Sequence, residues 1–95
     1  MIGLMLKNEP ANIFFIFEKE DYHPIHSLFV KYEFDAIYLD RKFKVVDKIL
    51  NIKPNRFFVK PKRKNLYLLE LEPKITKKFK IDVGDRLIIS GETNV

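Results

Sequence analysis

Residues 34–40 read FDAIYLD, and this short stretch decides the fold. Alternate side chains of a β-strand share a face, so a strand here places Asp35 on the same side as Ile37 and Leu39. The strand therefore aims a carboxylate at the protein interior. Because a buried carboxylate without partners is costly, we expect Asp35 to accept hydrogen bonds from neighbouring backbone, with a ligand contact or catalytic role as alternatives.

Short strand-like segments surround this stretch on both sides. The continuous apolar run Ile13–Phe17 predicts a strand that is buried on both faces. Apolar residues on both sides of Val45 and Val46 predict a bulge or two-sided burial at that point. Besides 34–39, the pattern predicts strands at residues 25–30, 43–50, 57–59, 66–71 and 86–90.

One short helix interrupts the strands near residues 73–80. Pro73 suits the first helical position, and Ile75 and Phe79, four residues apart, are predicted to face the core. Many short strands with one short helix predict a mainly β fold, a compact antiparallel β barrel or sandwich.

The composition predicts a single domain over residues 1–95. Hydrophobic residues make up 46% of the 95, including nine Phe and four Tyr, which is enough for a core. The absence of cysteine excludes disulfides and thiolate metal sites. No apolar run reaches the roughly 20 residues that span a bilayer, and no signal segment follows Met1, so we expect a cytoplasmic protein without a membrane partner.

The net charge of +5 is unevenly distributed. Residues 1–47 carry a net charge of −2 and residues 48–95 a net charge of +7. The stretch 53–64, KPNRFFVKPKRK, holds six bases and no acid. It predicts either a solvated basic face or a weak anion or nucleic-acid patch. The residues of this patch are Lys53, Arg56, Lys60, Lys62, Arg63 and Lys64.

Several short motifs occur in an order that is typical of one family. They are Gly3-Leu4-Met5, Phe14–Phe17, His26–Phe29 leading to Phe34–Asp40, Val45-Val46, Leu69–Leu71 and Gly84-Asp85. In this order they resemble domain-of-unknown-function family 192 (DUF 192), also catalogued as uncharacterised protein family UPF 0127. The resemblance covers about residues 3–89. It implies a mostly β, jelly-roll-like fold and no established activity.

The chain also departs from the family pattern. Members usually carry a further strand before the Gly-Leu-Met motif, whereas this sequence begins at Met1. Glu33 and Pro73-Lys74 replace a proline and a glycine that are common in the family. A missing first strand would leave an unpaired edge, and a homodimer is one arrangement that would cover it.

Two carboxylates carry the enzymatic hypothesis. Asp35 shares a face with Ile37 and Leu39, and Glu70 shares one with Leu66 and Leu68. Such a pair could bracket a scissile bond as acid and base, as in a hydrolase, or could serve as structural hydrogen-bond acceptors.

The histidines and the aromatic residues give weaker signals. His23 and His26 lack a cysteine or a clear third ligand, so we expect no metal and no cofactor. Phe57, Phe58 and Tyr67 could stack on bases beside the basic stretch, or could be core residues.

The sequence therefore favours a non-enzymatic small β domain that binds a ligand or a protein partner. Its candidate binding surface consists of His26, Ser27, Lys31, Asp35 and Glu70. A nucleic-acid-binding module that uses residues 53–64 is the alternative, and a hydrolase-type enzyme that uses Asp35 and Glu70 is the third hypothesis.

Overall fold

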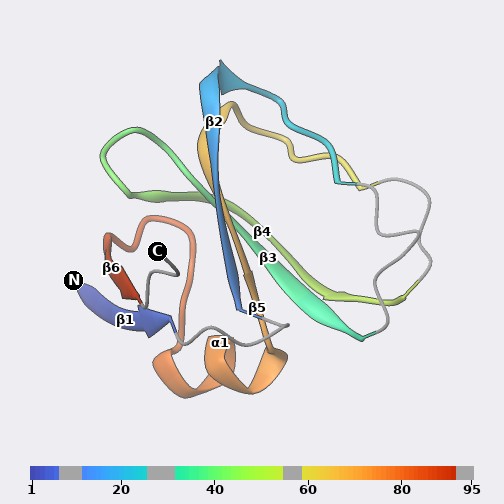
Figure 1. Ribbon diagram of the computed structural model, residues 1–95, viewed down its shortest axis with the longest axis vertical. Helices are drawn as coiled ribbons and strands as arrows, with labels where there is room; N and C mark the ends of the chain where they lie inside the picture. Colours follow the sequence, from blue (N-terminus) through green and yellow to red (C-terminus); the bar gives the residue numbers. More distant parts are fainter. Residues whose placement is uncertain (7–11, 26–31, 55–58, 92–95) are drawn as a thin grey trace.

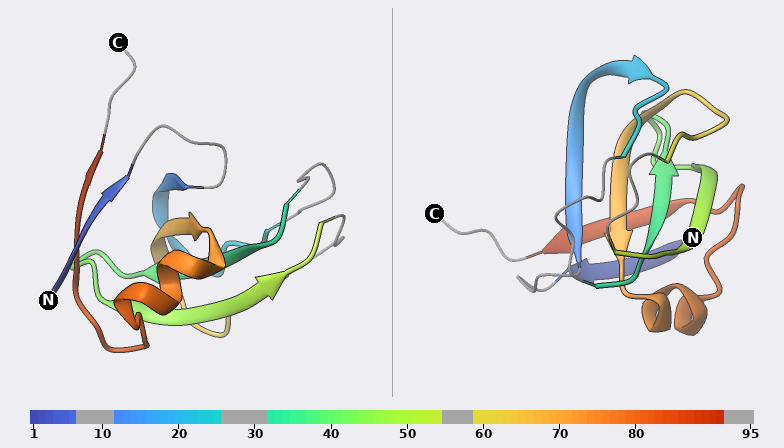
Figure 2. Two further views of the ribbon diagram at one scale, coloured as in Figure 1. Left: turned by 90° about the horizontal axis from the view of Figure 1, so that it is seen from below. Right: turned by 90° about the vertical axis from the view of Figure 1, so that its right-hand side faces the viewer.

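A computed structural model describes residues 1–6, 12–25, 32–54 and 59–91. Its strands are β1 (Ile2–Leu6), β2 (Ile13–Asp21), β3 (Phe34–Leu39), β4 (Val45–Ile52), β5 (Asn65–Leu71) and β6 (Leu87–Gly91), and its helix is α1 (Pro73–Phe79). Four strands form an antiparallel sheet in the order β2-β5-β3-β4, while β1 and β6 form a separate parallel pair. Figures 1 and 2 show β1 and β6 beside one end of the larger sheet, with α1 close to β1.

β3 is the central strand, and all six of its residues are buried. Its Ile37 and Leu39 face a core cluster with β5, β1 and β6, whereas Phe34, Ala36 and Tyr38 face a second cluster. The second cluster also contains Ile25, Ile52, Val59 and Leu68. Because both faces of β3 are covered, its sequence has no polar face except at Asp35.

The mainly β class with one short helix is confirmed, but the finer architecture differs from the prediction. The described strands form two separate sheets and no closed barrel, and β1 pairs with β6 in parallel rather than antiparallel. Parallel neighbours need a long connection, and these two strands lie near opposite ends of the described chain.

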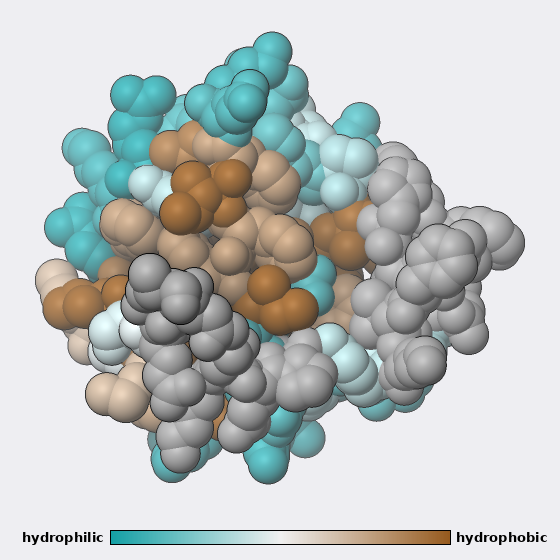
Figure 3. Space-filling model, viewed as in Figure 1, coloured by the Kyte–Doolittle hydropathy of each residue, from teal (hydrophilic) through white to brown (hydrophobic). Residues whose placement is uncertain are grey.

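β2 is an edge strand, so the prediction that Ile13–Phe17 is buried on both faces was wrong. Ile16 is 70% exposed and Phe15 is also exposed. Figure 3 shows apolar side chains gathered over the middle of the face along which β2 runs. An apolar run alone does not distinguish an inner strand from an edge strand, because that difference depends on which strands pair.

Two further predictions concern the bulge in β4 and the short strands on either side of β3. The register shift of β4 against β3 between Asp47 and Val45 confirms the bulge. Of the strands predicted at 25–30 and 57–59, the described residues Ile25 and Val59 form an isolated antiparallel bridge with one another. Residues 26–31 and 55–58 lie outside the described part of the chain.

The helix α1 begins at Pro73, as predicted, and ends at Lys80, whose φ of 52° is left-handed. Ile75 packs against the core, but Phe79 is exposed, so its predicted core position was wrong. Thr76 is the buried residue of this helix. No helix within the described ranges is long and apolar enough to cross a membrane.

Candidate functional site

Asp35 points into the protein, as its alternation with Ile37 and Leu39 predicts. The residue is 2% exposed and stands opposite Leu71 of β5 in the register. Its Oδ1 accepts a hydrogen bond from the backbone N–H of Asn51 at 2.8 Å. Asn51 has a left-handed φ of 55°, at the irregularity where β4 shifts its register against β3. Asp35 therefore holds a strained piece of β4 in place.

A pocket of about 310 Å³ opens beside Asp35, between β3, β4 and α1. We call it the Asp35 pocket. Its polar lining residues are Asp35, Lys48, Asn51, Thr76, Lys77, Lys80 and Asp82. Three of these residues come from α1 and its C-cap. Thr76 and Lys80 are four residues apart and so lie on one face of the helix, and Lys77 is adjacent to Thr76.

Lys48 and Asp82 neutralise one another at the wall of this pocket. Lys48 Nζ lies 3.1 Å from Asp82 Oδ1 and donates to the carbonyl oxygen of Ile81 at 3.3 Å. The hydrogen bond from Lys48, followed by that from the Val83 N–H, lowers the pKa of the Asp82 carboxyl. Both side chains are thus engaged with each other.

The two remaining lysines of the pocket are exposed, and they make no ion pair with any residue that the structure describes. Lys77 and Lys80 therefore leave two cations at the pocket rim that can attract an anion.

Unused hydrogen-bonding capacity lies at the base of the pocket. The hydroxyl Oγ1 of Thr76 is buried without a partner in the described structure. The second carboxylate oxygen of Asp35 accepts no hydrogen bond from the described residues. Buried polar atoms are usually satisfied, so the unpartnered hydroxyl of Thr76 is unusual for the lining of a surface depression.

Glu70 lies on the opposite face of the sheet from Asp35. It stands opposite Ala36 in the register, beside Leu68 and Tyr38, and is 6% exposed. Burial raises the pKa of its carboxyl. Burial first, then the charges of Asp47 and Glu70, also raise the pKa of the Tyr38 hydroxyl, which donates to the carbonyl oxygen of His23 at 2.9 Å.

This separation removes the geometric basis for an acid and base pair. Directly opposed residues of neighbouring strands share a face, so Asp35 faces the side of Leu71 and Glu70 the side of Ala36. Two carboxyl groups that bracket one glycosidic bond lie only about 5–10 Å apart across a shared cleft. A β-sheet that is buried on both faces separates Asp35 from Glu70.

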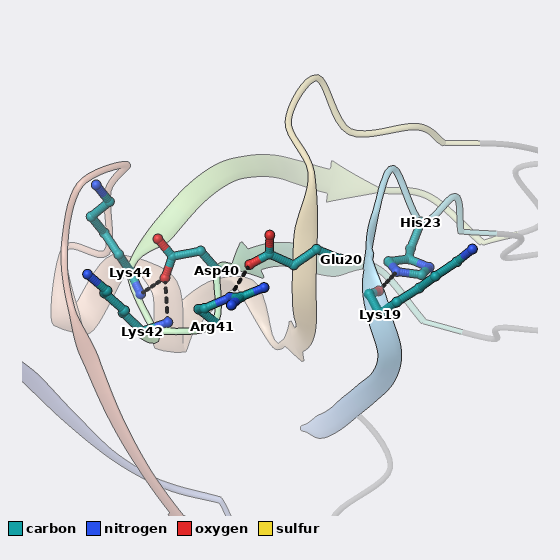
Figure 4. A network of polar contacts seen from close by, with 7 residues as sticks. All are labelled: Lys19, Glu20, His23, Asp40, Arg41, Lys42 and Lys44. Atoms are coloured by element: carbon teal, nitrogen blue, oxygen red, sulfur yellow. Dashed lines mark hydrogen bonds and ion pairs between the residues drawn. The ribbon is translucent and has the colours of Figure 1, made fainter.

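Of the other predicted binding residues, His26, Ser27 and Lys31 lie outside the described residues. His23 is described, and it stacks on Phe17 and donates from Nε2 to the carbonyl oxygen of Lys19 at 2.8 Å (Figure 4). Among the described residues, no three His, Cys, Asp or Glu side chains are grouped so that they could hold a metal ion.

Figure 4 also shows how the turn after β3 is fixed. Asp40 Oδ1 accepts the backbone N–H groups of Lys42 at 2.8 Å and Lys44 at 3.0 Å. Arg41 forms an ion pair with Glu20 of β2 at 3.1 Å, which links this turn to the edge strand.

The basic patch is exposed wherever it is described. Lys53, Lys60, Lys62, Arg63 and Lys64 are exposed, and Arg56 lies outside the described residues. Lys53 pairs with Glu33 at 3.2 Å, and the backbone N–H of Lys62 donates to Asp47 Oδ2 at 2.8 Å. The backbone of the turn is therefore anchored by Asp47. Arg63 donates to the carbonyl oxygen of Lys62 at 3.3 Å, and Lys60 Nζ lies 6.0 Å from the ring centroid of Tyr22.

The aromatic residues named with this patch give it no described stacking platform. The ring of Tyr67 stacks with Phe43 at a centroid distance of 4.5 Å and with Phe14 at 5.4 Å. These three rings belong to the margin of the core cluster. Phe57 and Phe58 lie outside the described residues.

Sequence reasoning found Asp35 but missed the lysines and the threonine around it. A signal was present, because a helix that begins at Pro73 places Thr76, Lys77 and Lys80 near one another on its surface. That this surface lies against the Asp35 side of β3 is decided by tertiary packing, which the local pattern does not contain.

Comparison with known proteins identifies relatives over nearly the whole chain. A UPF0127 protein from Pyrococcus abyssi is 34% identical over 87 residues, which are 90% of this chain and 73% of that protein. A UPF0127 protein from Pyrococcus furiosus is 34% identical over 88 residues, with coverage of 90% and 74%.

Two solved structures share the fold. One is a protein from Sinorhizobium meliloti named as a candidate transcription regulator, with a TM-score of 0.75 and 19% identity over 88% of this chain and 68% of that one. The other is a protein of unknown function from Novosphingobium aromaticivorans, with a TM-score of 0.74, 19% identity and coverage of 88% and 63%. At this identity they show the fold alone.

The family model DUF192, described as Uncharacterized ACR, COG1430, matches residues 1–89. This match agrees with the order of motifs from Gly3-Leu4-Met5 to Gly84-Asp85 and with the relatives from Pyrococcus. The chain belongs to the DUF192 family.

Proposed function

We propose that this domain is a binding module for a small molecule that carries both hydroxyl groups and an anionic group, such as a sugar phosphate. The observation that carries the proposal is the carboxylate of Asp35 at the base of a pocket whose rim bears the unpaired lysines Lys77 and Lys80. Most buried carboxylates serve only as structural acceptors, but this one also borders open space.

The chemistry of the lining defines the ligand class. The free carboxylate oxygen of Asp35 accepts hydrogen bonds, so it suits a hydroxyl or an amine. Lys77 and Lys80 suit a phosphate or a carboxylate, for which lysine acts as a point charge. A volume of about 310 Å³ lies at the small end of the range for ligand pockets, which favours a compact molecule.

Binding explains these residues better than hydrolysis does. Among the described residues, Asp35 has no second free carboxylate beside it, because Glu70 faces the other side of the sheet and Asp82 is engaged by Lys48. Without a paired acid and base, the pocket offers recognition rather than a bond-breaking arrangement.

The proposal is tested by a titration of the ¹⁵N-labelled protein with ribose 5-phosphate, followed by amide chemical shifts. We expect saturable shifts at Asn51, Thr76 and Lys77, and much weaker effects from ribose or inorganic phosphate alone. Because one partly exposed lysine contact is lost, Lys77→Gln should weaken binding by about threefold to tenfold.

Lys78→Gln is the matched control for Lys77→Gln. Lys78 is the next residue of the same helix and is also exposed, but it does not line the Asp35 pocket. Equal losses in the two variants would show general charge attraction, and shifts that fall outside the pocket would refute the proposed site.

The basic patch supports a second function, a weak interaction with nucleic acid or other polyanions. Lys60, Lys62, Arg63 and Lys64 are all exposed, and no described carboxylate pairs with their side chains. Four such cations on one turn suit phosphates without selecting a base sequence.

A further inference from the structure

β1 has one free edge among the described residues. It pairs in parallel with β6, and the Ile2 N–H donates to the carbonyl oxygen of Arg86 at 2.9 Å. In a parallel ladder alternate residues bond to the same neighbour, so Ile2, Leu4 and Leu6 direct their backbone groups toward β6. The N–H and C=O groups of Gly3 and Met5 therefore point toward the other edge of β1.

This free edge borders a second pocket, which we call the β1–α1 groove. Figures 1 and 2 show β1 between β6 and α1, and the groove of about 430 Å³ lies between β1 and the helix. Its apolar lining includes Leu4, Leu71, Ile75 and Phe79. Gly3 is exposed, and a Cβ added there would meet no atom within 4 Å, so the side-chain face of β1 is open at this residue.

An edge strand beside a helix, with an apolar floor between them, is the geometry that accepts an added strand. An extended peptide can then use backbone hydrogen bonds to the strand and place alternate side chains in the groove. Met5 and Phe79, which are 75% and 36% exposed, would be covered by such a peptide.

The rim of the groove carries Lys74, Lys78 and Glu72 and so has a net positive charge, which distinguishes an acidic peptide from a second copy of β1 as the occupant. Lys78 Nζ lies 5.5 Å from the ring centroid of Phe79 and makes no ion pair within the described chain, whereas Lys74 pairs with Glu72 at 3.1 Å. Residues 1–6 carry no acidic side chain. The β1 strand of a second copy would therefore bring no carboxylate to Lys78, so the charge favours another occupant.

We propose that the β1–α1 groove binds an extended acidic peptide segment of a partner protein, added as a strand to β1. The backbone groups of Gly3 and Met5 form hydrogen bonds with the peptide backbone. Alternate side chains of the peptide pack on the apolar floor of the groove, and a carboxylate of the peptide pairs with Lys78. This site is separate from the Asp35 pocket, from which it is divided by α1.

The probe is a fluorescein-labelled seven-residue peptide of alternating valine and glutamate, with fluorescence anisotropy as the measurement. A peptide of alternating valine and lysine and an acidic peptide with central proline are the controls. We expect saturable binding of the first peptide alone, because the second repels Lys78 and the third cannot continue a strand.

Two substitutions separate pairing from charge. Met5→Pro removes an N–H that faces the free edge and makes no bond to β6, so the fold should survive while peptide binding is lost. Lys78→Glu should weaken the acidic peptide by about threefold to tenfold and should favour the basic one. Met5→Ala and Lys19→Glu, at an exposed lysine far from any proposed site, are the controls, and neither should change affinity more than about twofold.

The possible results divide clearly. Loss of binding in Met5→Pro with retained circular dichroism and melting temperature supports the proposal, as does the reversed preference of Lys78→Glu. Equal binding to the parent and both variants overturns it, and so does the absence of binding at millimolar peptide. A parent dimer that Met5→Pro converts to a monomer, seen by sedimentation, would instead assign the edge to a second copy and would also overturn it.

Discussion

At the scale of one residue, the aspartate at position 35 joins an observed structural role to the binding role that we propose for it. Its Oδ1 accepts the N–H of Asn51, whose left-handed backbone would otherwise be unfavourable, and the residue lines the Asp35 pocket. The inward direction of Asp35 could be predicted, because alternation along one strand determines it. The identity of its partner could not, since Asn51 reaches Asp35 only through an irregular register between β3 and β4.

We predict that Asp35→Asn destabilises the protein by about 1–3 kcal/mol, because a charged acceptor of a buried N–H is replaced by a weaker one. Asp35→Ala should cost at least as much. Chemical denaturation monitored by fluorescence measures both values. Glu18→Gln, at an exposed position of β2, is the control and should change stability by less than about 0.5 kcal/mol. A fully stable Asp35→Asn would leave ligand binding as the reason for the carboxylate.

Glu70 should give the stability of the protein a distinct pH dependence. Burial raises the pKa of its carboxyl, so the folded state holds the proton more tightly than the unfolded chain, in which the pKa is about 4.3. The contribution of Glu70 to stability therefore falls as pH rises from that value through the raised folded pKa. In Glu70→Gln this fall should be absent, so the variant should gain relative to the parent between pH 4 and pH 7. Denaturation of both proteins at the two pH values measures the difference, and an unchanged difference would contradict the assignment.

At the scale of elements, the local sequence pattern predicted β3 and the start of α1. It failed for features that depend on which strands pair and which elements pack together. The bounds of β3 and the helix at Pro73 follow from alternation and from the preference of proline for the first helical turn. The edge position of β2 and the exposure of Phe79 depend on neighbours that lie far away in the sequence. The same limit applies to Glu70, whose face relative to Asp35 is set by the register of β5 against β3.

The C-terminus of α1 offers a test of an element. Lys80 occupies a left-handed conformation at the helix C-cap, which glycine adopts without strain. We predict that Lys80→Gly raises the free energy of unfolding by about 0.5–1 kcal/mol, and that it lowers affinity for ribose 5-phosphate because a rim cation is lost. Lys77→Gly, inside the helix, should instead destabilise by about 1 kcal/mol. Thermal unfolding of the two variants measures these changes in stability. A loss of stability in Lys80→Gly would show that the Lys80 side chain stabilises the fold by more than its left-handed backbone destabilises it.

At the scale of the whole molecule, the two halves of the chain differ in charge, and the fold concentrates part of that difference on one exposed turn. The backbone N–H of Lys62 is held by Asp47, and the side chain of Asn65 donates to the carbonyl oxygen of Arg63. Neither of these two bonds involves a basic side chain, whereas the Arg63 guanidinium also donates to the carbonyl oxygen of Lys62 at 3.3 Å. We therefore expect the fold to survive when the charge of the turn is removed.

This expectation allows a direct test of polyanion binding. We predict weak binding to duplex DNA without sequence preference, with a log–log dependence on salt of about −0.9 for each phosphate neutralised. Changing Lys60, Lys62, Arg63 and Lys64 together to glutamine should make the slope shallower by up to about 3–4, since each lost contact releases no counterion. Fluorescence anisotropy across a salt series gives the slope. A second variant, with Lys42, Lys44, Lys74 and Lys78 changed to glutamine, carries the same net charge and should keep most of it. Equal slopes in the two variants would show that overall charge attracts the DNA, and tight, sequence-selective binding at physiological salt would mean that the basic turn, rather than the Asp35 pocket, carries the main function.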